Sequence, residues 1–268
     1  MLVIFDEFLK LNSNAGNKRF QRELLLGKHG TIIIDVKGDY FDGKSINIIL
    51  SKLYFITKRY KKGCKRIIFR FINDFRPKDK LTYIIFESII YMLHKYYDYE
   101  VNIIIQKCKT SIHTIGVKGS LLLNFARRNI DKTQFQKKFM WIIDMTHFRR
   151  MVNYEDYEEQ SKLMYDIKHF VVNLGVNKDD STKIAEIVAE LADNACEHAQ
   201  SDCLVDIDIA EGEFRKNGDE DGIYYSVNVS VLNFSEKYIW NNLEEKIVNK
   251  QYGRQGSSFL SALGCGTY

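Results

Sequence analysis

Three polar residues in the second half of the chain are spaced so that they could act together on one ligand. Glu190, Asn194 and His198 follow one another at intervals of four residues. In an α-helix of 3.6 residues per turn, each such step advances only about 40° around the axis, so the three side chains form one stripe. Carboxylate and amide oxygens are ligands that Mg²⁺ accepts, usually together with water and phosphate oxygens. The stripe therefore carries oxygen atoms of the kind that such an ion binds, and Asn, a weak helix former, is typical of a position where the side chain is used.

The segment around the stripe has the pattern of an amphipathic helix followed by a strand. We expect Asp180 or Ser181 to cap this helix. Residues 203–209 alternate between apolar and polar, as a half-buried strand does. A preceding helix over residues 157–174 ends at Gly175, and a second strand covers residues 223–232. The helix is expected to bury an apolar arc that consists of Ile184, Ile187, Val188, Leu191, Ala195 and Ala199. A solvated polar flank is the alternative interpretation of the stripe.

The ten residues from Glu190 to Ala199, ELADNACEHA, resemble the N-box of the GHKL (Bergerat-fold) ATPases. The spelling is most similar to the histidine kinases and the anti-sigma-factor serine kinases, and the likeness covers residues 160–235. The resemblance implies ATP and Mg²⁺ as cofactors. It makes Asn194 the metal ligand, Glu190 the catalytic base or its orienter, and His198 part of the nucleotide-binding stripe.

The end of the chain departs from this family pattern. Asn233 stands where the family has an Asp that reads the adenine amino group, and Phe234 replaces the neighbourhood of a glycine. An Asn carbonyl can still accept a hydrogen bond from an amine, but it is neutral. Only 35 residues follow Asn233, too few for the lid, the G2 box and the closing strands. We therefore expect an incomplete domain that binds ATP weakly or not at all and shows no measurable turnover. A sheet edge should stay uncovered beside residues 223–232, unless another chain or the tail 253–268 covers it.

The first half alternates strand and helix patterns, which predicts a parallel sheet with right-handed crossovers. The expected strands are 31–36, 65–75 and 101–106, and the expected helices are 44–60 and 79–97. This βαβαβ module resembles the STAS domains that partner anti-sigma kinases. One more buried strand is expected at 139–145. The sequence thus predicts an α/β protein with a basic module in residues 1–150 and an incomplete ATP-binding domain in residues 151–268.

Charge is divided unevenly between these halves. Residues 1–150 carry 29 Lys and Arg against 13 Asp and Glu, whereas residues 151–268 carry 10 against 22. The resulting net charges of +16 and −12 allow the two halves to attract each other, or the first half to bind an acidic partner. Arg149 and Arg150 belong to its basic clusters. His147, which lies beside them, is a weak candidate for a phosphoacceptor histidine, because no acidic residue adjoins it in the sequence.

Composition limits the class of protein further. No apolar run of about 18 residues is present, so no membrane span is expected. The cysteines show no CxxC pair and no zinc spacing, which indicates reduced thiols in a cytoplasmic protein; they are Cys64, Cys108, Cys196, Cys203 and Cys265.

Three functions are consistent with these observations. The first is an ATPase or protein kinase of bacterial signalling that acts on a protein partner. The second is a nucleotide-sensing or partner-binding regulator without turnover. The third is a nucleic-acid-associated protein that uses the basic half. The sequence leaves the partner and the oligomeric state open.

Overall fold

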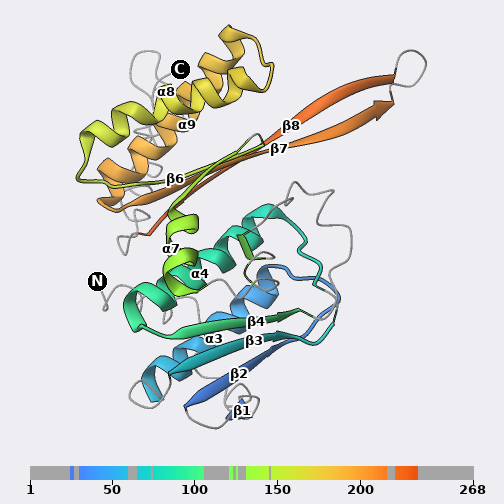
Figure 1. The fold of residues 1–268 in the computed structure, drawn as a ribbon, viewed down its shortest axis with the longest axis vertical. Helices are drawn as coiled ribbons and strands as arrows, with labels where there is room; N and C mark the ends of the chain where they lie inside the picture. The colour runs from blue at the N-terminus through green and yellow to red at the C-terminus, as the bar shows by residue number, and fades with distance from the viewer. Residues whose placement is uncertain are drawn as a thin grey trace, which may run out of the picture. The chain divides into compact units, whose positions relative to one another are not determined.

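The computed structural model describes residues 25–26, 30–59, 65–73, 75–105, 121–122, 125, 131–144, 146–215 and 221–234. The chain divides into two units, Met1–Phe139 and Met140–Tyr268. The first contains a largely parallel sheet with helices, and the second an antiparallel sheet with helices (Figure 1). The expected α/β class is confirmed.

Strands and helices of the first unit follow the predicted βαβαβ order. The elements are β2 (Thr31–Val36), α3 (Gly43–Arg59), β3 (Arg66–Phe71), α4 (Lys80–Tyr97) and β4 (Glu100–Ile105). β2, β3 and β4 are parallel neighbours in that order, and the short β1 (Leu25–Leu26) adds antiparallel to β2. A further helix, α7 (Lys132–Met140), lies near the end of this unit.

Burial alternates along β2, β3 and β4, so one face of this sheet is largely buried and the other is more open. Helix α3 packs against β2, α4 packs against β4, and the two helices contact each other. The aromatic rings of Phe69 in β3 and Phe86 in α4 meet edge to face with centroids 5.0 Å apart. On the other face, Arg70 donates two hydrogen bonds to Asp35 on the neighbouring strand, at 2.8 and 3.0 Å. That face is only partly covered and carries apolar side chains as well, among them Ile104, which is exposed.

His94, near the end of α4, is a titratable group enclosed by aromatic rings. Its side chain is only 1% exposed. The ring meets Phe135 of α7 edge to face at a centroid distance of 5.3 Å. Burial lowers the pKa of His94 to about 4, and the positive charge of Lys132 adds to this effect. The imidazole is therefore neutral in the folded protein at pH 7.

We expect His94 to make the protein less stable in acid. An unfolded histidine has a pKa of about 6.5, so the unfolded chain binds a proton between pH 6.5 and 4 that the folded chain does not. The free energy of unfolding should fall as pH falls through this window, by about 3 kcal/mol in total. Urea denaturation of the wild type and of His94→Leu at pH 7 and pH 4.5 measures the difference. The matched control is His169→Leu, since His169 is exposed on the second unit. Equal pH dependence in wild type and His94→Leu would contradict the assignment.

The second unit begins before residue 150, the expected domain boundary, and its first elements are two paired strands. Its sheet has the order β5-β6-β7-β8 and is antiparallel throughout. The strands are β5 (Trp141–Ile143), β6 (His147–Val152), β7 (Cys203–Arg215) and β8 (Asp221–Asn233); the helices are α8 (Tyr157–Asn173) and α9 (Lys178–Ala199). Since β6 pairs with β7, the unit starts at Met140 and not after residue 150. The strand expected at 139–145 is present as the three-residue β5, but the prediction that it is buried is wrong, because Trp141 and Ile143 are exposed, and α7 runs to Met140.

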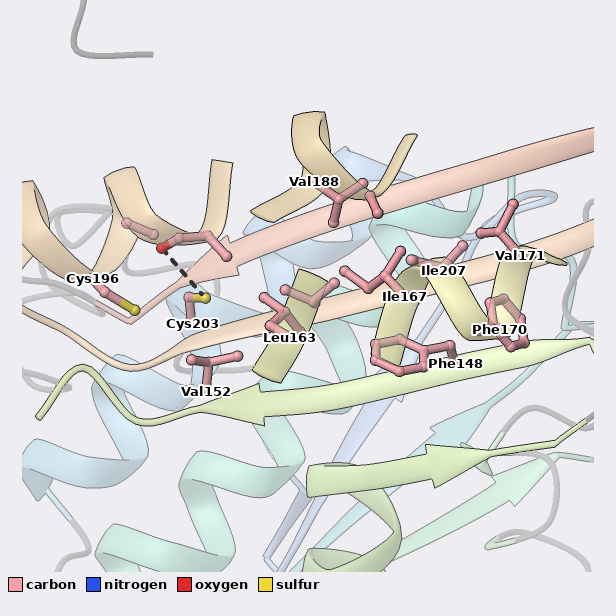
Figure 2. Packing of buried hydrophobic residues seen from close by; sticks show 14 residues of the cluster. Phe148, Val152, Leu163, Ile167, Phe170, Val171, Val188, Cys196, Cys203 and Ile207 are labelled. Atoms are coloured by element: carbon pink, nitrogen blue, oxygen red, sulfur yellow. Dashed lines mark hydrogen bonds between the residues drawn. The ribbon is translucent and has the colours of Figure 1, made fainter. Parts of the chain in front are cut away.

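Helices α8 and α9 lie side by side on one face of this sheet (Figure 1). Between the two layers, Phe148 of β6 packs with Phe170 of α8 and with Ile207 of β7 in one buried cluster (Figure 2). The two helices are joined by a tight turn in which Gly175 has a φ of +86° and its N–H bonds to the Val172 carbonyl at 2.9 Å. Gly175 therefore ends α8 as predicted, since this backbone conformation favours glycine.

Candidate functional site

Helix α9 positions the predicted site residues Glu190 and Asn194. It begins at Lys178, three residues before Ser181, and its N-cap is Asn177 and not Asp180 or Ser181. The Asn177 side chain accepts a hydrogen bond from the Asp180 N–H at 2.9 Å, which satisfies one of the unpaired donors of the first turn. A helix fixed at this end carries the site on a rigid element.

Glu190 and Asn194 are in direct contact on the outer side of α9. The Asn194 amide nitrogen donates to the Glu190 backbone carbonyl at 2.8 Å and approaches its carboxylate oxygen at 3.4 Å. Glu190 is exposed and Asn194 is half-buried. Both contacts use the amide nitrogen, so the carbonyl oxygen of Asn194 takes part in neither. That oxygen is the atom that would ligate a metal ion.

The surroundings of Asn194 are electronegative. Burial raises the pKa of the neighbouring Asp193 carboxyl, and the negative charges of Glu190 and Glu197 raise it further. Such a field favours a cation. Among the described residues, however, no group of three or more His, Cys, Asp and Glu side chains could hold a metal ion by itself. A cation here would therefore need ligands from its own substrate, which is how Mg²⁺ is held with nucleotide phosphates.

Two apolar residues flank this polar pair and were expected in the core. Ile187 is 44% exposed and Leu191 is 40% exposed, so the prediction that both face inward is wrong. α9 packs against β7 and β8, and Val229 of β8 is also exposed. The exposure of Ile187 could have been predicted from the sequence, because Ile187 lies two turns before Asn194 and only about 20° away around the helix. This apolar surface beside Asn194 suits a flat, uncharged group such as a nucleobase.

The remaining predicted site residues are less closely associated with Asn194. His198 lies in the last turn of α9, and its side chain is outside the described part of the structure. Asn233 ends β8, where it is exposed and paired in register with Cys203. Among the residues that the structure describes, no hydrogen bond joins Asn233 to Glu190 or Asn194. Within the described residues β8 pairs only with β7. The tail 253–268, one possible cover for the outer edge of β8, lies outside the described residues.

A second polar cluster lies on the sheet face opposite the helices. The Asp206 carboxylate of β7 contacts the His147 ring nitrogen at 2.9 Å and also contacts Arg149, and all three side chains are buried. Asp206 is thus the acidic neighbour that His147 lacked in the sequence. Arg150, on the helix side, pairs with Asp166 of α8. Arg149 and Arg150 are therefore not part of an exposed basic surface that could bind nucleic acid.

No known protein family, curated protein or solved structure matches this chain. The described helices include none that is both long and apolar enough to cross a membrane.

Proposed function

We propose that the second unit binds Mg²⁺–ATP as a GHKL-type (Bergerat-fold) nucleotide-binding domain of bacterial regulation. The activity would be ATP hydrolysis or phosphorylation of a partner protein, in the cytoplasm. The contact between Asn194 and Glu190 on the exposed side of α9 carries the proposal. It is supported by the order of α8, α9, β7 and β8, because the resemblance implies two helices followed by antiparallel strands.

The side chains present fit the chemistry that this function needs. Asn194 would offer its carbonyl oxygen to Mg²⁺, while its amide nitrogen stays fixed to the Glu190 backbone. When bound, the metal ion neutralises phosphate charge. The Glu190 carboxylate is exposed next to that position and would orient or deprotonate the attacking group. Ile187 and Leu191 would exclude water from one side of the nucleotide.

A regulator that binds nucleotide without turnover is the second candidate. Asn233 favours it, because the position that reads the adenine amine in the family is here a neutral, exposed amide. A neutral acceptor gives a weaker hydrogen bond than a carboxylate does. The two candidates share the metal site on α9 and differ in whether phosphate is released or transferred.

Replacing Asn194 by alanine tests the function common to both candidates. We expect the affinity for ATP in the presence of Mg²⁺ to fall to the value measured with EDTA, because the only protein ligand proposed for the metal ion is lost. Titration followed by NMR chemical shifts measures even weak binding, and circular dichroism shows whether the fold is kept. Glu190→Gln should leave this binding nearly unchanged, since glutamine keeps both oxygen atoms that the Asn194 amide contacts, the backbone carbonyl oxygen and a side-chain oxygen.

The matched control is Asn173→Ala, which changes an exposed Asn at the end of α8. It should bind Mg²⁺–ATP as the wild type does. Equal Mg²⁺-dependent affinities for Asn194→Ala and the wild type would rule out this metal site. A wild-type chain that shows no Mg²⁺-dependent binding would rule out the proposed function itself.

A further inference from the structure

Two cysteines meet where α9 ends and β7 begins. Cys196 and Cys203 are both free thiols, both buried, and both members of the core cluster (Figure 2). The Cys203 sulfur lies 3.9 Å from the backbone oxygen of Ala192. In an α-helix that oxygen accepts the N–H of the residue four positions later, which is Cys196. The Cys203 sulfur is therefore within about 7 Å of the Cys196 nitrogen.

The chain reversal between the two cysteines holds them in this position. Gln200 adopts a left-handed conformation, with a φ of +48°, and turns the chain out of α9. Cys203 is then the first residue of β7 and is paired with Asn233 of β8. A disulfide needs Cα atoms about 4.4–6.8 Å apart, a spacing within reach of a helix end and a strand start in contact.

We propose that Cys196 and Cys203 form a reversible disulfide that switches the nucleotide site of the second unit. The effect on ATP rests on the proposed function, whereas the disulfide itself does not. A peroxide is the oxidant class: one thiol takes an oxygen from hydrogen peroxide to give a sulfenic acid and water. The second thiol then attacks that sulfur, and the hydroxyl leaves as a second water. The sulfurs lose two electrons in total, and the O–O bond gains them.

The position of the pair explains why oxidation would change nucleotide binding. Asn194 lies two residues before Cys196 on the last full turns of α9. A disulfide bond of about 2.05 Å is more than about 1 Å shorter than the closest approach of two unbonded sulfurs, so forming it draws the two sulfur atoms together. The last turn of α9 must then shift toward β7, and the Asn194 amide moves with it. Since a misplacement of about 1 Å can cost 10²-fold at a catalytic site, we expect at least a tenfold loss of Mg²⁺–ATP affinity.

The experiment uses the full chain with Cys64, Cys108 and Cys265 replaced by serine. It is treated with hydrogen peroxide under native conditions and mapped by peptide mass spectrometry. We expect a Cys196–Cys203 cross-link that dithiothreitol reverses, slower amide hydrogen exchange in the last turn of α9, and weaker Mg²⁺–ATP binding in the oxidised form. The matched control adds Cys203→Ser, which should form no cross-link and keep its affinity after peroxide treatment.

Absence of the cross-link from the folded chain would overturn the proposal. A cross-link that leaves both hydrogen exchange and ATP affinity unchanged would overturn the switch. If the reduced chain does not bind Mg²⁺–ATP, the proposed function fails, while the cross-link and the hydrogen exchange still decide whether the pair is a redox device.

Discussion

Replacing Asp206 by asparagine is expected to lower the free energy of unfolding of the second unit by about 3–5 kcal/mol, since breaking a buried ion pair leaves a charge uncompensated. The Asp206 carboxylate is fully buried and contacts both Arg149 and His147. Asparagine keeps the shape but leaves the Arg149 guanidinium facing a neutral amide. For a protein of this size the melting temperature should fall by on the order of 10 °C.

The exposed ion pair between Glu158 and Lys162 provides the control for this prediction. These side chains are 2.6 Å apart on α8 and largely open to water. Exposed pairs contribute at most about 1 kcal/mol, so Glu158→Gln should change stability little. The double variant Asp206→Leu with Arg149→Met should recover part of the loss, because an apolar pair can replace a buried ionic one. Similar unfolding energies for Asp206→Asn and Glu158→Gln would show that the buried cluster is not ionic in the folded protein.

A fragment that starts at Met140 is expected to fold, whereas one that starts at Met151 is expected to remain unfolded. The shorter fragment lacks β5 and most of β6, including Phe148, which is fully buried between the sheet and α8. Loss of a buried Phe side chain alone costs about 3–5 kcal/mol. Loss of Arg149 and His147 also leaves the buried Asp206 without the two side chains that contact it. Together these losses approach the whole stability of a typical domain, about 5–15 kcal/mol.

Circular dichroism and the dispersion of amide proton NMR signals distinguish the two fragments. The longer fragment carrying Ile143→Ala is the control, because Ile143 is half exposed on β5 and its truncation should be tolerated. The longer fragment carrying Phe148→Ala should melt at a lower temperature than this control. If the fragment from Met151 melts cooperatively at the temperature of the longer one, β6 is not an integral part of the second unit.

The local elements of this protein could be predicted from its sequence because their signals are local. Strands β2, β3 and β4 and helices α3 and α4 follow from the periodicity of apolar residues, and each bound falls within a few residues of the expected one. The proximity of Glu190 and Asn194 also required no tertiary information. Residues four apart on a helix are neighbours in any fold that keeps the helix.

Tertiary structure alone decided which strands pair, which charges meet and which apolar residues stay exposed. Arg149 reads as part of a basic surface in the sequence, yet its carboxylate partner Asp206 lies 57 residues away on a neighbouring strand. Ile187 and Leu191 belong to the apolar side of α9 by their type, but helices and strands elsewhere in the unit determine how much of that side is covered. Pairing between β6 and β7 likewise joins segments on either side of two helices. Periodicity reports only contacts along the chain, whereas these features depend on contacts between segments that are distant in sequence.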